Sequence, residues 1–113
     1  LRREFGSQLH LVRQIGLEYV AFNTRRPPFS DPRVRRALSM ALERDVLTGR
    51  ILLGGEPAAY CVVPPGVENY PQPACADFGS WPASRRQQEA RVLLAAAGHG
   101  PTKPLEVRLR YAN

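Results

Sequence analysis

The sequence predicts an α/β fold, more strictly α+β, built as a single domain over residues 1–113. Segments near both ends alternate apolar and polar residues as strands do, and two internal segments place apolar residues at helical spacing. A proline-rich stretch separates the two helical segments. We therefore expect short strands, two to three helices and one long proline-rich loop, a size that suffices for a modest core.

Two strands are expected near the start of the chain and one at its end. Residues 9–22 have the pattern of two short strands divided near Gly16. Residues 105–111 alternate apolar with charged or polar positions, which is typical of a strand with one solvent-exposed face. The Pro27-Pro28 pair excludes both a helix and an interior strand at its own position. Because the chain stops directly after a strand, we expect it to be a fragment.

The clearest helix start lies at Asp31-Pro32. Asp31 is a good N-cap, and Pro32 falls at the first helical position, where a missing N–H costs nothing. The apolar residues that follow form one helical stripe, made of Val34, Ala37, Leu38 and Ala41. Three arginines then point mostly to the other faces, namely Arg33, Arg35 and Arg36. We expect a bend at residues 43–45 and a second short helix that Gly54-Gly55 ends.

Residues 56–83 contain six prolines and are expected to form an extended loop. The loop is rich in aromatic and β-branched residues, with Trp81 as a packing anchor, so we expect it to pack on the helices. Cys61 and Cys75 lie within it. Either they form a disulfide, worth about 3 kcal/mol on the chain-entropy model, or they are two free buried thiols. Their spacing does not decide between these two states.

A further helix is expected directly after this loop. Ser84 and Gln87 have the spacing of a capping box, and Gly98 falls at the C′ position. One face of this helix is apolar, and it consists of Ala90, Leu93, Leu94 and Ala97. These signals make it the best-defined helix of the chain.

The chain is basic, with a formal net charge of +6, and fifteen of its sixteen basic residues are arginine. These residues are spread from Arg2 to Arg110, which is typical of a solvated surface rather than of a phosphate-binding patch. An Arg-rich nucleic-acid-binding module is therefore the less favoured alternative. No apolar run approaches the roughly 20 residues that a membrane-spanning helix needs, and the first ten residues lack the pattern of a signal peptide.

Catalytic and metal-binding patterns are missing from the sequence. The motifs GxGxxG, GxxxxGK[ST], GxSxG and HExxH do not occur, so we expect no enzyme activity and no cofactor. Glu43 and Asp45 are better explained as helix-terminus charges than as a catalytic pair. His10 and His99 are isolated, and the cysteines do not have a zinc-ligand spacing, so no metal site is expected.

Several short motifs follow one another in a distinctive order. They are Phe22-Asn23, Pro28-Phe29, Asp31, Val34-Arg35-Arg36-Ala37-Leu38, Ala41-Leu42-Glu43-Arg44, Pro64-Pro65 and Ala90 through Gly98. This order resembles the family 5 solute-binding proteins of bacterial ABC importers, the oligopeptide, dipeptide and nickel receptors. Glu43 departs from the family pattern, which has aspartate there, so the second helix is expected to be less firmly capped. The cysteine pair is not part of the resemblance.

The resemblance implies a lobe of the type II periplasmic-binding-protein fold, of which this chain is a partial C-terminal-lobe segment. It implies a periplasmic or otherwise extracytoplasmic receptor, free or anchored as a lipoprotein, that delivers oligopeptides to an ABC importer. The implied partners are a peptide ligand and the permease subunits, with no nucleic acid. In this family the strand with a Tyr-x-Asn end points toward the ligand, which implies that Tyr111 and Asn113 bind it. For Asn113 a simple strand-end cap is the alternative, and for the whole chain a ligand-sensing lobe of a regulator.

Overall fold

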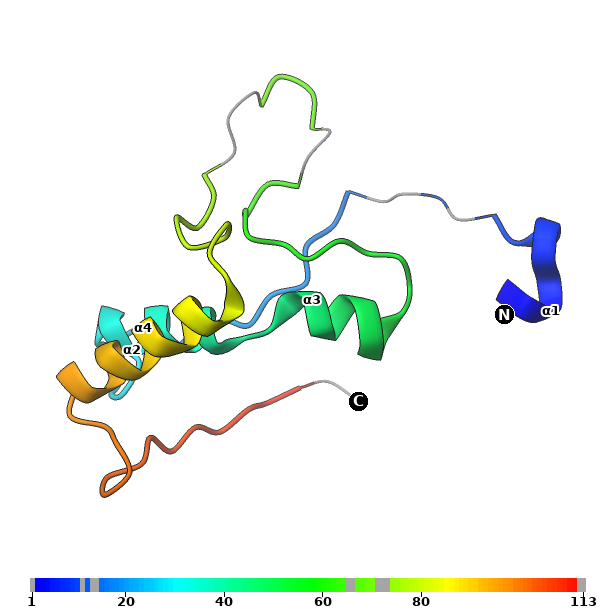
Figure 1. Ribbon diagram of the computed structural model, residues 1–113. Coiled ribbons are helices and arrows are strands. Elements are labelled where there is room, and N and C mark those ends of the chain that lie inside the picture. Colours follow the sequence, from blue (N-terminus) through cyan, green and yellow to red (C-terminus); the bar gives the residue numbers. More distant parts are fainter. Residues whose placement is uncertain (1, 11, 13–14, 65–66, 71–73, 112–113) are drawn as a thin grey trace.

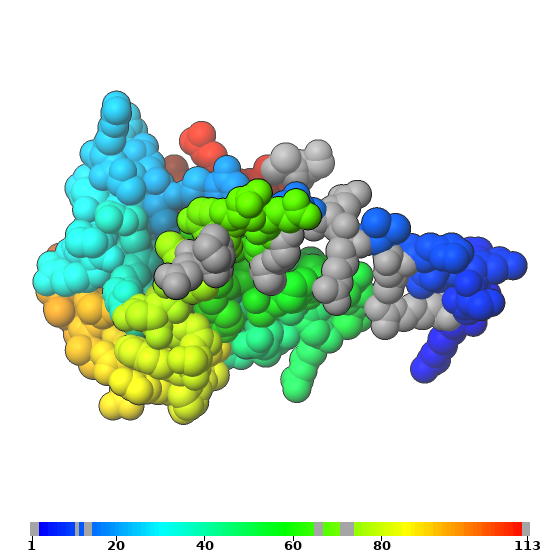
Figure 2. Space-filling model, turned by 90° about the horizontal axis from the view of Figure 1, so that it is seen from above, coloured from blue at the N-terminus to red at the C-terminus, as the bar shows by residue number. Residues whose placement is uncertain are grey.

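The computed structural model describes residues 2–10, 12, 15–64, 67–70 and 74–111 (Figure 1). Its elements in chain order are α1 (Arg2–Phe5), the 3-10 helix η1 (Gly6–Gln8), α2 (Pro32–Ala41), α3 (Arg44–Val46), the π-helix η2 (Leu47–Leu52) and α4 (Ala83–Ala96). The molecule is elongated, with extents of 53 × 36 × 29 Å. Figure 2 shows α2 (cyan) and α4 (yellow to orange) at one end and residues 2–10 (blue) at the other.

Helix α2 begins as the sequence predicts. The Asp31 carboxylate accepts a hydrogen bond from the Arg33 backbone N–H at 2.8 Å, and Pro32 occupies the first helical position. The buried stripe differs from the prediction, because it consists of Val34, Ala37 and Met40. The predicted Leu38 is only half-buried and the predicted Ala41 is exposed. The buried residues of α2 are spaced three apart, which is less than one turn of 3.6 residues. The buried stripe therefore runs obliquely around the helix and includes Met40 instead of Ala41.

The predicted bend is confirmed, but the predicted helix stop is not where the glycines are. Helix α2 ends at Ala41, and α3 starts at Arg44 and continues into η2. The left-handed residue after η2 is Leu53, with φ 55°, and its N–H donates to the Thr48 carbonyl at 3.2 Å. This bond spans five residues, as in a π-helix, so the turn closes before the chain reaches Gly54-Gly55.

Helix α4 ends as predicted but begins differently. The His99 N–H donates to the Leu94 carbonyl and the Gly98 N–H to the Ala95 carbonyl, both at 2.9 Å, with Gly98 at φ 83°. This is a Schellman motif, which confirms Gly98 at C′. The predicted capping box is wrong, because the helix starts at Ala83 after an N-cap Pro82 that offers no side-chain acceptor. Gln87 instead donates to the Glu43 carboxylate, far away in the sequence.

The hydrophobic core lies where α2 and α4 run side by side (Figure 1). Its buried residues are Ala37, Met40, Phe78 and Ala90, and Tyr60, Ala76, Trp81, Leu93 and Leu94 pack against them. Two helices thus share the core with the two arms of the proline-rich loop. The expectation that this loop packs through its aromatic residues is confirmed, with Trp81 as one of its anchors.

The strands that the sequence predicts do not appear among the described residues. Residues 15–23 and 104–111 carry no assigned secondary structure. Within the described part of the chain, β-pairing is limited to two isolated bridges, Cys61 with Cys75 and Gly100 with Lys103. A strand forms only where a neighbouring strand accepts its backbone hydrogen bonds, and the described residues offer these two segments no such neighbour. The α+β prediction is therefore confirmed for its helices alone.

No helix in the described ranges has both the length and the apolar character that crossing a membrane would require.

Candidate functional site

Of the two side chains implied to bind ligand, the structure describes one. Tyr111 lies at the end of the segment 104–111, with its side chain 79% exposed. Asn113 lies outside the described residues. The structure therefore bears on Tyr111 alone, and the high exposure of this residue is the observation relevant to its expected role.

A cavity of about 540 Å³ lies where the segment 104–111 passes the double-proline step. Pro27, Pro28 and Phe29 line it on one side, and the segment contributes Glu106, Val107 and Arg108. Its surface is thus mainly apolar, with one carboxylate and one guanidinium. Such a lining suits a ligand or chain segment with a hydrophobic body and paired polar groups.

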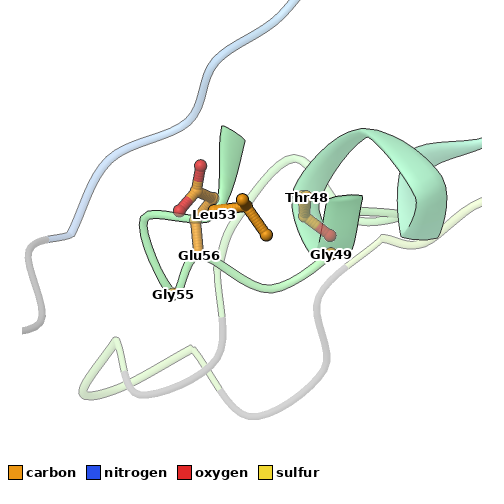
Figure 3. Close-up of a pocket in the computed structure, with 5 residues that line it drawn as sticks. All are labelled: Thr48, Gly49, Leu53, Gly55 and Glu56. Atoms are coloured by element: carbon orange, nitrogen blue, oxygen red, sulfur yellow. The ribbon is translucent and has the colours of Figure 1, made fainter. Parts of the chain in front are cut away.

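A second cavity, of about 440 Å³, lies beside η2 (Figure 3). Thr48 and Gly49 contribute from η2, and Leu53, Gly55 and Glu56 from the turn that follows. Figure 3 shows the Glu56 carboxylate and the Leu53 side chain on one side and Thr48 on the other. One hydroxyl and one carboxylate without a nearby base do not make a catalytic set.

The arginines of α2 are engaged within the fold. The Arg33 side chain donates to both oxygens of Asp31 and, at 2.8 Å, to the Ala96 carbonyl, so it ties the start of α2 to the end of α4. Arg35 donates to the carbonyls of Phe29 and Ser30 at 2.7 and 3.1 Å. The prediction that these side chains leave the buried stripe free is confirmed, but they link α2 to its neighbours instead of only facing solvent.

Arg36 links α2 to the proline-rich loop. Its Nη2 donates to both Asp77 carboxylate oxygens, at 2.8 and 2.6 Å, and its guanidinium lies 5.4 Å from the Phe78 ring centroid. The hydrogen bond from Arg36 lowers the pKa of Asp77 below its ordinary value. In the same way, the hydrogen bond from the Arg33 side chain lowers the pKa of Asp31.

Charged side chains of α3 and α4 meet the loop in an arginine–tyrosine cluster, which we define as Arg44, Asp45, Tyr60 and Arg86. The Tyr60 hydroxyl donates to the Asp45 carboxylate at 3.3 Å. The guanidinium groups of Arg44 and Arg86 lie 4.9 and 5.5 Å from the Tyr60 ring centroid, within cation–π range. Burial is the main cause of the raised pKa of Tyr60 and of the lowered pKa of Arg44.

Arg86 is the one buried charged residue in the described part of the chain, with 5% of its surface exposed. Its Nη1 donates to the Trp81 carbonyl at 2.6 Å, and its Nη2 lies 3.9 Å from Asp45. Its Nε is buried, and the structure gives that atom no hydrogen-bond partner. The neighbouring Arg85 behaves differently, because it lies on the Trp81 ring at 3.9 Å and stays exposed.

Sequence reasoning missed this cluster, although part of its signal was present. Arg86 stands four and seven residues before Ala90 and Leu93, on the same face of α4 as the apolar stripe. A charged residue in line with a buried stripe is a reason to expect a buried charge. Asp45 and Tyr60 carried no comparable signal, because only the fold brings them to α4.

The structure decides between the two states of the cysteine pair. Cys61 and Cys75 form a disulfide across fourteen residues. Next to it, the Ala76 N–H donates to the Tyr60 carbonyl at 2.7 Å. Of the two states that the sequence left open, the disulfide is the one present.

The described residues hold no group of three His, Cys, Asp or Glu side chains that is arranged for a metal ion. The arginine–tyrosine cluster has acceptors and donors but no nucleophile with an adjacent base. Its groups hold together the loop, α3 and α4, so the cluster is best understood as an architectural centre that positions these elements.

Comparison with known proteins shows the family. Residues 4–113 match the model of the bacterial extracellular solute-binding proteins, family 5 Middle. The periplasmic murein peptide-binding protein MppA of Escherichia coli is 37% identical over 98% of this chain, and the periplasmic oligopeptide-binding protein OppA of the same organism is 33% identical over 98%. The chain spans 20% of the length of each of these two relatives.

A solved structure agrees with the sequence comparison. OppA of Burkholderia pseudomallei superposes with a TM-score of 0.66 at 43% identity, covering 73% of this chain and 16% of that protein. The murein tripeptide-binding protein MppA of Escherichia coli superposes with a TM-score of 0.68 at 40% identity, covering 75% of this chain and 16% of that protein. This chain therefore belongs to the bacterial extracellular solute-binding proteins of family 5.

Proposed function

We propose that this chain is part of an extracytoplasmic receptor that binds oligopeptides and delivers them to an ABC importer. The observation that carries the proposal is the family match over residues 4–113. Two relatives that align over 98% of the chain are named as periplasmic peptide-binding proteins, one for murein peptides and one for oligopeptides. The receptor works outside the cytoplasm, in the periplasm or anchored as a lipoprotein, and its partners are a peptide and the permease subunits.

Within that receptor, residues 1–113 form a single domain unit that is a partial segment of the C-terminal lobe. Two features support the proposal that it is a partial segment. The chain spans 20% of the length of its relatives. Moreover, apolar side chains along its extended segments are exposed, namely Val12, Ile15, Tyr19, Val20, Val107 and Leu109. Apolar residues that alternate along an extended segment become favourable when further strands and helices of the lobe cover them.

Tyr111 and Asn113 contact the peptide in the complete receptor. A tyrosine at a segment end supplies an aromatic surface with a polar tip, and an asparagine amide donates to and accepts from a peptide backbone. The 79% exposure of Tyr111 supports this role, because the side chain is open to whatever the second lobe brings against it. Receptors that close around a ligand place such residues on the inner face of each lobe.

The receptor acts by binding and not by catalysis. It needs no cofactor and no metal, since recognition of a peptide uses backbone hydrogen bonds and side-chain pockets. Nucleic acid is not among its partners. The hydrogen bonds from Arg33, Arg35 and Arg36 to protein acceptors support this point, because these groups would have to leave their partners to contact phosphate.

Isothermal titration of the full-length protein with mixtures of short peptides tests the function. We expect heat of binding with peptides, and we expect the Tyr111→Ala variant to bind them more weakly. Tyr19→Ala is a matched control, since Tyr19 is 78% exposed but lies on the other extended segment. The proposal fails if peptides give no heat while an unrelated class of ligand does. The proposed site fails if Tyr111→Ala and Tyr19→Ala bind peptide equally well. Retention of DNA or RNA on a filter with a steep dependence on salt would favour the nucleic-acid alternative.

A further inference from the structure

The disulfide joins the two arms of the proline-rich loop, residues 56–61 and 75–81, near the point where they pack against the core. We call Tyr60 and residues 76–81 the packed base. Residues 62–64, 67–70 and 74 are the described part of the loop beyond the disulfide, and Figure 1 shows this part standing away from the helices. The segments before Cys61 and after Cys75 return to α2, α3 and α4. The disulfide therefore marks the boundary between a projecting loop and a packed base.

On both sides of the disulfide the next residue belongs to the packed base. Tyr60 precedes Cys61, Ala76 follows Cys75, and both pack against the buried core. The Ala76 N–H donates to the Tyr60 carbonyl at 2.7 Å, so one hydrogen bond and one covalent bond join the arms at adjacent positions. A separation of the two cysteines would therefore act directly on two residues that pack against the core.

The two arms also pack closely next to the disulfide, where Tyr60 meets residues 76–79. The Gly79 N–H donates to the Ala76 carbonyl at 2.9 Å. A Cβ atom placed on Gly79 would lie 3.1 Å from both that carbonyl oxygen and the Tyr60 Cβ atom. The Tyr60 ring meets the Phe78 ring edge to face, with centroids 6.5 Å apart. Tyr60 is therefore packed closely over the turn formed by residues 76–79.

The packed base is also where the helices are linked by charge. Tyr60 donates to Asp45 of α3, and Asp77 accepts two hydrogen bonds from Arg36 of α2. Helix α4 by contrast has its own backbone hydrogen bonds and the Schellman motif at its end. Helix α4 also contacts the base, through the Arg86 hydrogen bond to the Trp81 carbonyl, but the backbone hydrogen bonds within α4 do not require the two arms to stay together.

We propose that the Cys61–Cys75 disulfide is a redox-sensitive clamp, cleaved by a dithiol reductant, whose opening loosens Tyr60 and residues 76–81 from α2 and α3 while α4 stays folded. The bond is within reach of a reductant, because Cys75 is exposed and Cys61 is half-buried. This inference does not depend on the proposed peptide-binding function. In an oxidising compartment the bond remains closed, and a dithiol is the class of molecule that opens it.

The exchange reaction balances with two thiols of one reductant molecule. A thiolate attacks the Cys75 sulfur, forms a mixed disulfide and releases the Cys61 thiolate. The second thiolate of the reductant then attacks the reductant sulfur of the mixed disulfide and releases the Cys75 thiolate. The protein gains two electrons and, after protonation, two thiols, while the reductant is oxidised to its own disulfide.

Hydrogen–deuterium exchange on the full-length protein, with and without dithiothreitol, tests the clamp. Thiol alkylation followed by mass spectrometry counts the free cysteines in each sample. We expect both cysteines blocked before reduction and alkylated after it. Peptides that cover residues 58–61 and 76–81 should then exchange about tenfold faster, and peptides within α4 should be nearly unchanged.

The Cys61→Ser/Cys75→Ser variant is the matched control. It should show fast exchange at residues 58–61 and 76–81 with or without dithiothreitol, which separates this bond from any other disulfide in the protein. If that variant does not fold, the reduced and oxidised wild-type samples still decide. The proposal is overturned if the two cysteines are alkylated without reduction. It is equally overturned if both are reduced and exchange in the base does not change, or if α4 unprotects to the same degree as the base.

Discussion

The helical centre, by which we mean α2, α4 and the loop residues packed against them, and the extended segments 15–23 and 104–111 have similar apolar content but differ in burial. Met40 of α2 is 2% exposed, whereas Leu109 of the segment 104–111 is 67% exposed. A helix satisfies most of its backbone hydrogen bonds within itself, so α2 and α4 bury their apolar faces against one another and the loop without needing a neighbouring strand. A strand needs the backbone of a neighbour, so residues 104–111 cannot complete their structure with the residues described. The difference shows which parts of this chain form their structure from nearby residues and which depend on partners outside the described residues.

The largest expected effect comes from the centre. Phe78 is 3% exposed and lies between Tyr60 and the α2–α4 pair. Phe78→Ala should lower the free energy of unfolding by about 3–5 kcal/mol, because it removes a buried ring and leaves a cavity. Urea denaturation followed by circular dichroism measures this. Phe5→Ala, at an exposed position near the first residues, is the control and should change stability little. Equal losses at the two positions would contradict this placement of the core.

A second mutation pair distinguishes the observed stripe of α2 from the predicted one. Met40→Ala should cost about 2–5 kcal/mol, the range for a buried large-to-small change. The sequence pattern had placed Leu38 in the stripe, but Leu38 is half-buried, so Leu38→Ala should cost clearly less. Thermal melts of the two variants rank them. If Leu38→Ala proved the more damaging, the helix would be rotated relative to the structure.

The centre could be predicted from sequence wherever one residue or one turn determines the outcome. Asp31-Pro32 fixes the start of α2, and Gly98 fixes the end of α4, through bonds that span at most five residues. Prediction failed where a distant partner decides. The Gln87 side chain donates to Glu43 instead of capping its own helix. Arg86 is buried, and the distant-element contact that accepts its hydrogen bond is the Trp81 carbonyl of the loop.

The strand prediction for the extended segments failed for the same reason, because a whole neighbouring strand, and not a single side chain, would have to be the distant partner. Alternation in residues 105–111 correctly identifies an extended conformation, but a strand is defined by its neighbours, and alternation carries no information on where they are. Prediction of the candidate site from sequence was limited by the same dependence on distant residues. Tyr111 came from a family resemblance, whereas Arg44, Asp45 and Tyr60 came together only through folding.

An intermediate effect is expected at the buried charge of the centre. Arg86→Ala leaves the Trp81 carbonyl without its 2.6 Å donor and should cost about 1–3 kcal/mol. The adjacent Arg85→Ala is the matched control, since it removes an exposed arginine that lies on the same Trp81 ring. Trp81 fluorescence during urea denaturation reports both variants. If Arg85→Ala and Arg86→Ala were equally stable, the hydrogen bond to the carbonyl would not hold the turn.

Acid should weaken the centre more than the extended segments. The pKa values of Asp31 and Asp77 are lowered in the folded protein, mainly by hydrogen bonds from Arg33 and Arg36. A lowered pKa contributes stability above the ordinary aspartate value of about 3.9. That contribution is lost as the pH falls through the lower folded value.

Melting temperatures measured from neutral to acidic pH check this dependence. The Asp31→Asn/Asp77→Asn variant should be less stable than wild type at neutral pH and should lose less on acidification. Glu18→Gln makes a charge change on an extended segment and should keep the wild-type slope. A double variant with the full wild-type slope would assign the acid sensitivity to other carboxyl groups.

The smallest effect in this chain tests the extended segment itself. Leu109→Ala should change the stability of residues 1–113 by no more than about 0.5 kcal/mol, since an exposed side chain has little packing to lose. On the proposed function, the same change in the full-length receptor should cost about 2–5 kcal/mol, because other elements of the proposed lobe would bury Leu109. Arg110→Ala, on the opposite face of the same segment, should be tolerated in both. If Leu109→Ala were equally harmless in the full-length protein, residues 104–111 would not be a buried strand of the lobe. The contrast between the two regions would then be intrinsic to the sequence and not a consequence of missing neighbours.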